Sequence, residues 1–342
     1  MSPGWTVTAI AAKVMGVLGS QRRFTAPASV ARASGLAQRG TRAADTVYAR
    51  VLARRLAIAS PADRKGLEAA ISAVGRDRAV VERAAASGAP VAAIAGLAAR
   101  WDNLPALALA MVRNPLGEGS VGPVTWGPTH ATQVDQTTCG AASLAMLTLI
   151  SDPFVALWVA TGQTIDSYMP PEVLRSETAR YPSHTVNERW VALQRVLHVA
   201  TTHSAVGPLP WPRSLGTPPW RVDNVARCAG LRFRGFVVDD ADQGDLAAAL
   251  AHASAALRDG IPVPLYVAGD SSMGLDAVVP RHVVLLVGRE GDEFRIYEPA
   301  SGAVHAVPIA QLSQPHGKLA ALGNWTRLAW FVLPTPSMGA RK

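Results

Sequence analysis

The second half of the chain sets one helical segment before a series of short apolar runs. Residues 242–258 place apolar side chains at helical spacing, and the runs 263–267, 282–287, 293–297 and 328–333 have the length and residue types of strands. A helix followed by consecutive strands is typical of an α+β fold, because a doubly wound fold alternates the two kinds of element. We therefore predict an α+β fold.

The first third of the chain has a helical pattern. Residues 45–58 bring their apolar positions near one face of a helix: Val47, Val51, Leu52, Leu56 and Ile58. Ser60 followed by Pro61 indicates the start of another helix. Residues 1–113 hold 31 alanines, which favours several short helices.

Glycine and proline are concentrated directly after this helical region, before the remainder of the chain. Both residue types interrupt regular structure, so residues 114–128 are predicted to be a linker. A length of 342 residues favours two units. The expected organisation is a basic helical region at 1–113, the linker at 114–128, and a domain at 129–342.

Charge is distributed unevenly. Residues 1–113 carry 16 Lys and Arg against 6 Asp and Glu, whereas the rest of the chain carries 17 against 19. The basic region is either an arm for an acidic protein or an anionic surface, or a solvated helical face. Nucleic acid is an unlikely partner, because the arginines are spread out with few aromatic side chains between them to stack on bases.

Composition narrows the class of protein. An apolar fraction of 49% with 17% charged residues excludes a wholly disordered chain. The longest candidate span, 84–99, is too short for a bilayer, so no transmembrane helix is predicted. Lys13 interrupts the apolar stretch 7–18 and no basic segment precedes it, so we expect no signal peptide and a cytoplasmic location.

The two cysteines exclude a disulfide framework and a Cys-rich zinc site. His198 and His203 lie five residues apart, off helical register, with no Cys or carboxylate close to them in the sequence. They form a poor metal site, so no metal or cofactor is expected. Cys228 has no acid, base or second thiol nearby, which indicates a core position.

Cys139 is different, because it is predicted to start a buried helix. Thr138 is a suitable N-cap, and apolar residues follow at helical spacing: Leu144, Leu147 and Ile150. Unpaired N–H groups and the helix dipole at this end favour a thiolate. Gly140 allows close approach of a substrate carbonyl, and the Gln133 amide could stabilise an oxyanion; Gln136 is the alternative, but spacing favours Gln133.

A base and its partner are predicted in a hairpin. The strands beginning at His282 and ending at Glu298 are joined by a turn at 288–292, so these two residues become cross-strand neighbours. A carboxylate beside an imidazole fixes its tautomer and leaves the other nitrogen to take the thiol proton of Cys139. The chain therefore carries a nucleophile, a base and an orienting acid in that order.

These motifs resemble those of a known family. The Gln-x5-Cys-Gly spacing, the Ala-Ala-x-Leu helix and the His-x15-acid-Pro-x-x-Gly hairpin are similar to those of the papain-like bacteriocin-leader (double-glycine) peptidases and their stand-alone relatives, over about 129–335. The resemblance implies a helix carrying Cys139 packed on an antiparallel sheet. It implies Cys139 as nucleophile, His282 as base, Glu298 as orienting acid and Gln133 as oxyanion donor.

Two positions depart from the family pattern. Glu298 replaces the usual Asp, and Thr138 replaces an Asp that commonly precedes the Cys. The longer Glu298 side chain is expected to reach the imidazole if the hairpin register relaxes.

We therefore predict a thiol hydrolase, a cysteine peptidase or amidohydrolase that cleaves a peptide or amide substrate through an acyl-enzyme on Cys139. Two alternatives stay open: an acyltransferase, if an amine replaces water, and an inactive papain-like binding module. Trp211 and Trp220 lie in a Pro-rich segment that either lines a substrate cleft or forms a rigid loop.

Overall fold

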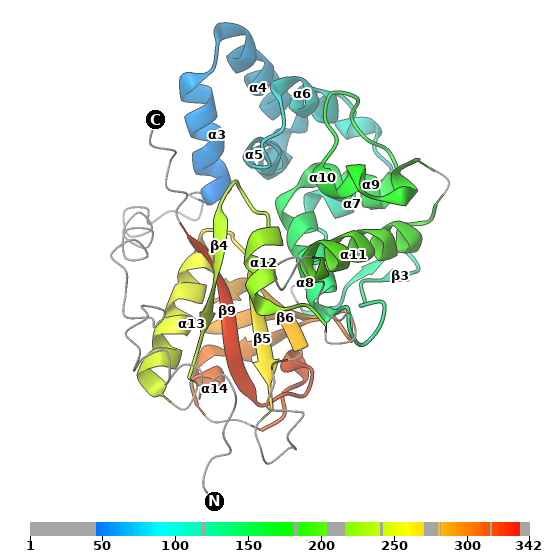
Figure 1. Ribbon diagram of the computed structural model, residues 1–342. Helices are drawn as coiled ribbons and strands as arrows, with labels where there is room; N and C mark the ends of the chain where they lie inside the picture. The colour runs from blue at the N-terminus through cyan, green and yellow to red at the C-terminus, as the bar shows by residue number, and fades with distance from the viewer. Residues whose placement is uncertain are drawn as a thin grey trace, which may run out of the picture.

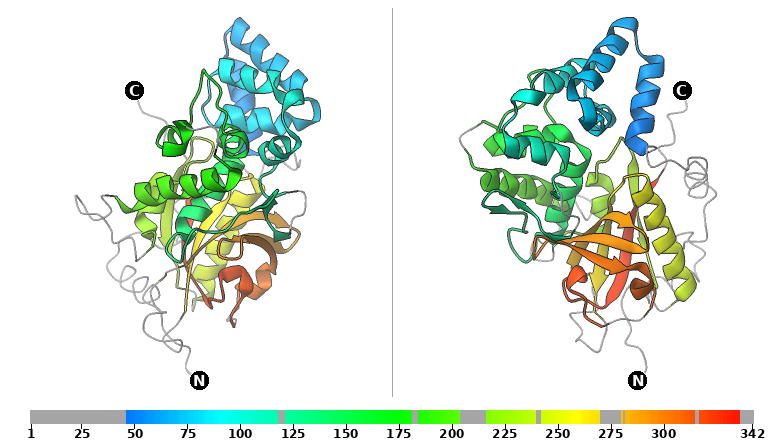
Figure 2. Two further views of the ribbon diagram at one scale, coloured as in Figure 1. Left: turned by 90° about the vertical axis from the view of Figure 1, so that its right-hand side faces the viewer. Right: turned by 180° about the vertical axis from the view of Figure 1, so that it is seen from behind.

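The computed structural model describes residues 46–117, 121–180, 184–203, 216–239, 242–269, 280, 282–314 and 317–335. In Figure 1 the N-terminal helices gather at one end of the molecule and the main sheet at the other, and both views of Figure 2 keep this arrangement. Buried side chains from both ends belong to one continuous hydrophobic core.

The main sheet of the described residues has seven strands in the order β1-β8-β7-β6-β5-β9-β4, and every neighbouring pair is antiparallel. Its strands are β1 (Gly122–Pro123), β4 (Arg232–Val237), β5 (Val263–Ala268), β6 (His282–Glu290), β7 (Glu293–Glu298), β8 (Ala303–Pro308) and β9 (Arg327–Thr335). A separate ribbon pairs β2 (Thr125–Trp126) with β3 (Thr129–His130). A mixed architecture of helices and one antiparallel sheet is an α+β fold, as predicted.

The sequence predicted four strands of this sheet and the helix before them. The predicted ends differ from the observed ends by at most three residues for β5, β6, β7, β9 and α13 (Gln243–Arg258). β4 and β8 were not predicted, because both carry partly exposed positions that weaken their apolar pattern. The central strands are covered on both faces. Every residue of β5 is buried, and so are residues 282–286 of β6.

Helices cover the sheet. α8 (Cys139–Ser151) packs on β6 and on α11 (Val186–Thr202), while α13 packs on β6, β9 and β5. α9 (Pro153–Thr161) follows α8 directly, and the two axes are bent by 109°. Among the described helices none is long and apolar enough to cross a membrane alone; α8 and α9 meet that length and composition only as this bent pair.

The N-terminal helices pack mainly on one another. They are α3 (Val47–Ile58), α4 (Pro61–Val74), α5 (Arg78–Ala86), α6 (Val91–Ala99) and α7 (Ala106–Arg113). α3 contacts α5, α4 contacts α6, and α7 packs against α9. The Ser60 side chain accepts a hydrogen bond from the Asp63 N–H and caps α4 as expected. The prediction for Ile58 was wrong: this last residue of α3 is 78% exposed, because the packed face of α3 ends before it.

Some basic residues of this region have structural roles. The buried Arg83 donates hydrogen bonds to backbone oxygens of Val112, Arg113 and Ile150, at the ends of α7 and α8. Arg55 donates to the backbone oxygens of Ala85 and Ala89. Helix C-termini carry unpaired carbonyls and partial negative charge, so these two guanidiniums stabilise the packing of helices and are not available to a partner.

The range predicted as a linker contributes to the sheet. Gly122 pairs with Val304 of β8, so β1 is the edge strand, and β2 follows within the same range. The division of the chain into domains stays a prediction.

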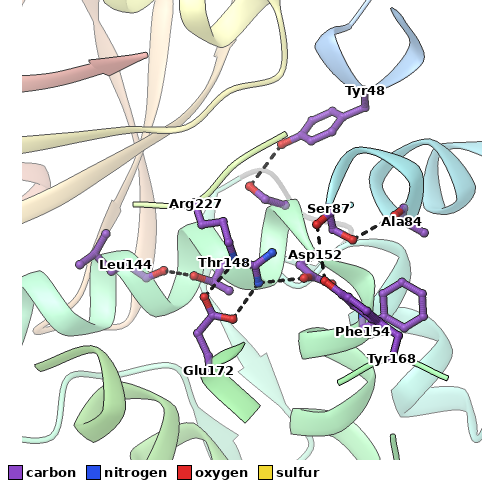
Figure 3. A network of polar contacts seen from close by, with 11 residues as sticks. Tyr48, Ala84, Ser87, Leu144, Thr148, Asp152, Phe154, Tyr168, Glu172 and Arg227 are labelled. Atoms are coloured by element: carbon purple, nitrogen blue, oxygen red, sulfur yellow. Dashed lines mark hydrogen bonds and ion pairs between the residues drawn. The ribbon is translucent and has the colours of Figure 1, made fainter. Parts of the chain in front are cut away.

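A buried ion cluster fixes the segment between α12 (Pro219–Val225) and β4 to the helical layer (Figure 3). Arg227 lies 2.8 Å from Asp152 and 2.7 Å from Glu172. Asp152 is the N-cap of α9, and Glu172 lies in α10 (Pro171–Leu174). One guanidinium thus joins two helix N-terminal regions to the strand that follows it.

Candidate active site

Cys139 is the first residue of α8, as the sequence predicted. Thr138 precedes it, but its hydroxyl donates to the backbone oxygen of Asp135 and accepts from the Asp135 N–H, and it does not cap the helix. The prediction of Thr138 as a capping side chain was therefore wrong, because the preceding turn uses that hydroxyl. The N–H groups in the first turn of α8 therefore receive no hydrogen-bond acceptor from the Thr138 side chain.

α8 is joined to β6 close to the reactive residues. The Ser143 hydroxyl donates a hydrogen bond of 3.1 Å to the backbone oxygen of Val283. Ser143 lies one helical turn after Cys139, and Val283 follows His282 directly. This contact fixes the helix with the thiol against the strand with the imidazole. No sequence pattern indicated this contact, because a Ser inside an apolar helix has no distinctive spacing.

His282 and Glu298 are brought together as predicted. Nε2 of His282, at the start of β6, lies 2.9 Å from Oε1 of Glu298, at the end of β7. Their exposed fractions are 8% for His282 and 3% for Glu298. The two strands form a hairpin with a tight turn at Gly291 and Asp292, so the connection is shorter than the predicted 288–292.

A β-bulge decides that the two side chains share a face. The register of β6 against β7 shifts by one residue at Val287. If the pairing next to the turn continued without this shift, Glu298 would lie opposite Leu285. The side chains of Leu285 and His282 are on opposite faces of the sheet, so Glu298 would then lie on the wrong face for His282. With the shift, Glu298 follows the pair of Tyr297 and Leu285 and lies opposite Val284, two residues from His282 and on the same face. The one-residue shift thus places the acid on the face of the imidazole.

Glu298 is held as a carboxylate. Its Oε1 also accepts from the Ala300 N–H at 2.8 Å, and its Oε2 accepts from the Ser301 N–H at 2.7 Å. Burial alone raises the pKa of Glu298, but hydrogen bonds from His282, Ser301 and Ala300 outweigh it and lower that pKa to about 2. The acid is therefore charged at neutral pH, and its orientation is fixed by the turn after β7.

His282 is stabilised as an imidazolium. Burial lowers its pKa, but side-chain hydrogen bonds with Cys139 and Glu298 outweigh that effect and raise the pKa of His282 to about 9. Since Nε2 is used by Glu298, Nδ1 is the ring nitrogen left for the thiol. The imidazole therefore lies between a thiol and a carboxylate.

Gly323 packs against the imidazole ring. A Cβ at this position would lie 2.6 Å from both Nε2 and Cδ2 of His282, and the φ of Gly323 is +62°. A larger residue would be strained in its backbone and would displace the ring. The Gly-Asn pair at 323 and 324 indicates a turn, but nothing in the sequence relates it to His282, which lies 41 residues earlier.

Gln133 lies beside the acid end of the hairpin. Its backbone N–H donates to the backbone oxygen of Pro299 at 2.8 Å. Its side-chain Nε2 donates to the backbone oxygen of Asp135 at 2.7 Å, while Oε1 is buried and has no hydrogen-bond partner among the described residues. The amide donor therefore satisfies the turn that precedes α8. The alternative, Gln136, is exposed.

Thr217 lies against Gly140, the residue after Cys139, and sequence reasoning missed it. A Cβ on Gly140 would lie 2.6 Å from Cβ and Oγ1 of Thr217, so the glycine makes room for this side chain. Thr217 is buried and its Oγ1 has no hydrogen-bond partner in the described part of the chain, while its backbone oxygen accepts from the Tyr266 hydroxyl at 2.8 Å. Burial first, and then the charge of Cys139, raise the pKa of Tyr266.

The two thiols differ in their surroundings. Cys139 is 1% exposed and shares a hydrogen bond with the imidazole of His282. Cys228 is equally buried, lies 3.1 Å from the Tyr48 hydroxyl, and has its pKa raised by burial. Cys228 thus occupies the predicted core position. The sequence did not decide whether Trp211 and Trp220 line a cleft. Trp220 belongs to α12 and is 41% exposed, and Trp211 lies outside the described residues.

Comparison with known proteins adds one structural likeness. No family model and no curated protein matches the chain. A solved structure, described as a double glycine motif protease from an AMS/PCAT transporter in complex with the leader peptide, is similar at 18% sequence identity and a TM-score of 0.28. The match covers 63% of this chain and 99% of that chain.

Proposed function

We propose that the protein is a papain-like cysteine hydrolase, a peptidase or amidohydrolase, that cleaves a peptide or amide bond through an acyl-enzyme on Cys139. One observation carries the proposal: the His282 imidazole hydrogen-bonds to Cys139 and, at 2.9 Å, to a buried Glu298 carboxylate. A thiol, a base and an orienting acid in this order are the requirements of thiol acyl transfer.

The first half of the reaction transfers the acyl group to sulfur. Nδ1 of His282 takes the proton of the Cys139 thiol, and the sulfur attacks the carbonyl carbon of the substrate. The C=O π pair moves to oxygen, and N–H groups at the start of α8 stabilise the resulting oxyanion. The C–N bond then breaks as the imidazolium returns its proton to the leaving amine.

The second half regenerates the enzyme. His282 removes a proton from water, the hydroxide attacks the thioester, and the carboxylic acid leaves as the Cys139 sulfur regains a proton. An amine in place of water would give acyl transfer with the same residues. In the structure the Gln133 Nε2 donates to the backbone oxygen of Asp135. Gln133 can therefore donate to the oxyanion only if this hydrogen bond breaks when the substrate binds.

Selective alkylation tests whether the thiol is activated. Iodoacetamide near neutral pH is expected to label Cys139 faster than Cys228, as measured by peptide mass spectrometry over time, and His282→Ala is expected to abolish the difference. Cys228 serves as an internal control because it is buried to the same degree as Cys139 and has no imidazole partner among the described residues. Slow and equal labelling of both thiols would reject the hydrolase.

One observation favours a second candidate, a binding module without catalysis: the Cys139 residue is only 1% exposed. The two functions differ in turnover. Incubation with a mixed peptide library, followed by mass spectrometry, should give cleavage products with the native protein and none with Cys139→Ala if the protein is a hydrolase. A module would bind peptides equally well with either variant and release no new termini.

A further inference from the structure

A cavity of about 760 Å³ lies between the end of α10 and the short helix η3 (Glu177–Arg180) on one side and α11 and α12 on the other. These elements are neighbours in the fold (Figure 1). The volume is in the range of small-molecule binding sites. None of Cys139, His282 and Glu298 contributes to its lining.

One stripe of α11 forms the apolar wall. The lining residues of α11 recur three and four positions apart, which places them on a single helical face: Ala192, Arg195, Val196, Val199 and Ala200. Val225 of α12 adds to this apolar surface. Val199 is 44% exposed, although a β-branched apolar side chain normally gains from burial. The apolar wall therefore faces the cavity without a covering side chain among the described residues.

The polar part of the lining carries more positive than negative charge. Arg175, Arg195 and Arg221 contribute guanidiniums, against Glu177 as the one carboxylate in the lining. Within the described ranges, neither Arg175 nor Arg195 forms an ion pair. Arg221 also has a buried Nε without a hydrogen-bond partner. Guanidiniums of this kind favour phosphate and carboxylate groups, which accept two parallel hydrogen bonds.

We propose that this cavity binds a small anionic amphiphile, with a phosphate or carboxylate head group at Arg175 and Arg195 and an apolar tail along the α11 stripe. The charge selects an anion, and the uncovered valines select a ligand with a hydrocarbon part. We favour a small molecule over a protein segment because the volume of the cavity is of ligand size. The site is independent of the proposed hydrolase activity.

Calorimetry with matched amphiphiles tests the proposal. The Cys139→Ala protein is titrated below the micelle concentration with octyl phosphate, octanoate, octanol and octyltrimethylammonium. We expect saturable one-to-one binding of octyl phosphate or octanoate, and binding of the neutral and cationic compounds weaker by about tenfold or more. The ratio between the two anions identifies the preferred head group. Inorganic phosphate without a tail should bind more weakly than octyl phosphate.

Charge-reversal variants locate the site. Arg175→Glu combined with Arg195→Glu is expected to weaken anion binding by about tenfold or more. Arg54→Glu combined with Arg232→Glu changes the net charge equally at exposed positions outside the cavity, and should leave binding unchanged. Val199→Glu should weaken binding of the tail, and its circular dichroism spectrum reports whether the fold is kept.

Three results would overturn the proposal. They are equal binding of octanol and the anions, equal loss of affinity in the two double variants, and no saturable binding of any anionic probe. Saturable binding of an acidic peptide with no binding of octyl phosphate would also reject the small-molecule site and assign the surface to peptide docking. Because all titrations use Cys139→Ala, a failure here is separate from a failure of the alkylation and cleavage tests.

Discussion

Glu298 lies diagonally across the hairpin from His282, on the same face, with 2.9 Å between Oε1 and Nε2. The extra residue Val287 in β6 produces this relationship by shifting the register by one. Side chains alternate along a strand, so a shift of one residue decides which face Glu298 occupies. The pairing of acid and base thus depends on a bulge near the other end of the hairpin.

Deletion of Val287 should separate the pair. The unshifted register places Glu298 opposite Leu285, away from His282, so the pKa of His282 should fall below about 9 as its carboxylate partner is lost. NMR titration of the imidazole measures this pKa, and alkylation of Cys139 should slow in parallel. Val287→Ala keeps the residue count and should retain the raised pKa. An unchanged pKa in the deletion variant would mean that the bulge does not place the acid.

Replacement of the acid itself tests its charge. Glu298→Gln keeps the size but removes the carboxylate, so we expect the turnover of any cleaved substrate to fall by about a hundredfold or more. Glu298→Asp keeps the charge but is one methylene shorter, and should retain more activity than Glu298→Gln. Equal activity of the two variants would show that the charge at this position does not support the imidazolium. Steady-state kinetics on a cleaved peptide provides the measurement.

The same pair predicts how stability depends on pH. The pKa of Glu298 falls from 4.5 to about 2 on folding, so its stabilisation is fully present above about pH 4.5 and is lost as the pH falls towards 2. The pKa of His282 rises from 6.5 to about 9, so its stabilisation is fully present below about pH 6.5 and is lost as the pH rises through 9.

Unfolding by urea as a function of pH checks this expectation. The free energy of unfolding should be greatest between about pH 4.5 and 6.5. Below and above that range it should fall by at most about 3 kcal/mol, and both decreases reflect the same interaction between His282 and Glu298. The difference between the native protein and Glu298→Gln isolates the pair from other titrating groups. A difference that stays constant from pH 3 to 9 would contradict it.

Gly323→Ala should displace the imidazole. The new Cβ would lie 2.6 Å from Nε2 of His282, in a backbone conformation with φ of +62°. Gly230→Ala is a matched control, because Gly230 has φ of +68° but no atom within 4 Å of an added Cβ. Both variants should lose about 1–2 kcal/mol of stability from backbone strain. Gly323→Ala alone should also slow alkylation of Cys139; equal rates in the two variants would exclude a role in positioning the ring.

Removal of the buried guanidinium should destabilise the helical layer. Arg227→Met leaves the carboxylates of Asp152 and Glu172 without their ion-pair partner, and we expect a loss of about 3–5 kcal/mol in thermal or urea unfolding. Arg78→Met removes an ion pair with Glu82 whose arginine side chain is 51% exposed, and should cost well under 1 kcal/mol. Similar losses in both variants would contradict a special role for the buried cluster.

Local patterns predicted much of the fold. The helix that begins at Cys139, the helix α13 and four strands were all expected from spacing and residue type, because each pattern repeats with the period of its own element. β4 and β8 were missed, since their apolar pattern does not show which positions the sheet buries. The end of α3 was misjudged at Ile58 for the same reason: apolar character does not tell which turn of a helix meets the core.

The candidate site was predicted in its residue types and only partly in its geometry. Cys139, His282 and Glu298 were chosen by spacing, and the three side chains meet in the structure. The amide of Gln133 was expected to face the oxyanion, but its donor bonds to the backbone of Asp135, because the preceding turn supplies a closer acceptor. Thr217 had no signal in the sequence, and its contact with the start of α8 joins segments 77 residues apart.

The amino-acid sequence by itself determined which helices and strands form around the chemically important residues, since these elements depend on neighbours a few positions away. The tertiary structure alone decided the face that Glu298 occupies, the contact of Gly323 with the imidazole and the cationic cavity beside α11. These features depend on the register of two strands, on a glycine 41 residues from His282 and on helices brought together by the core. Such contacts follow from packing over long sequence separations, which no local period encodes.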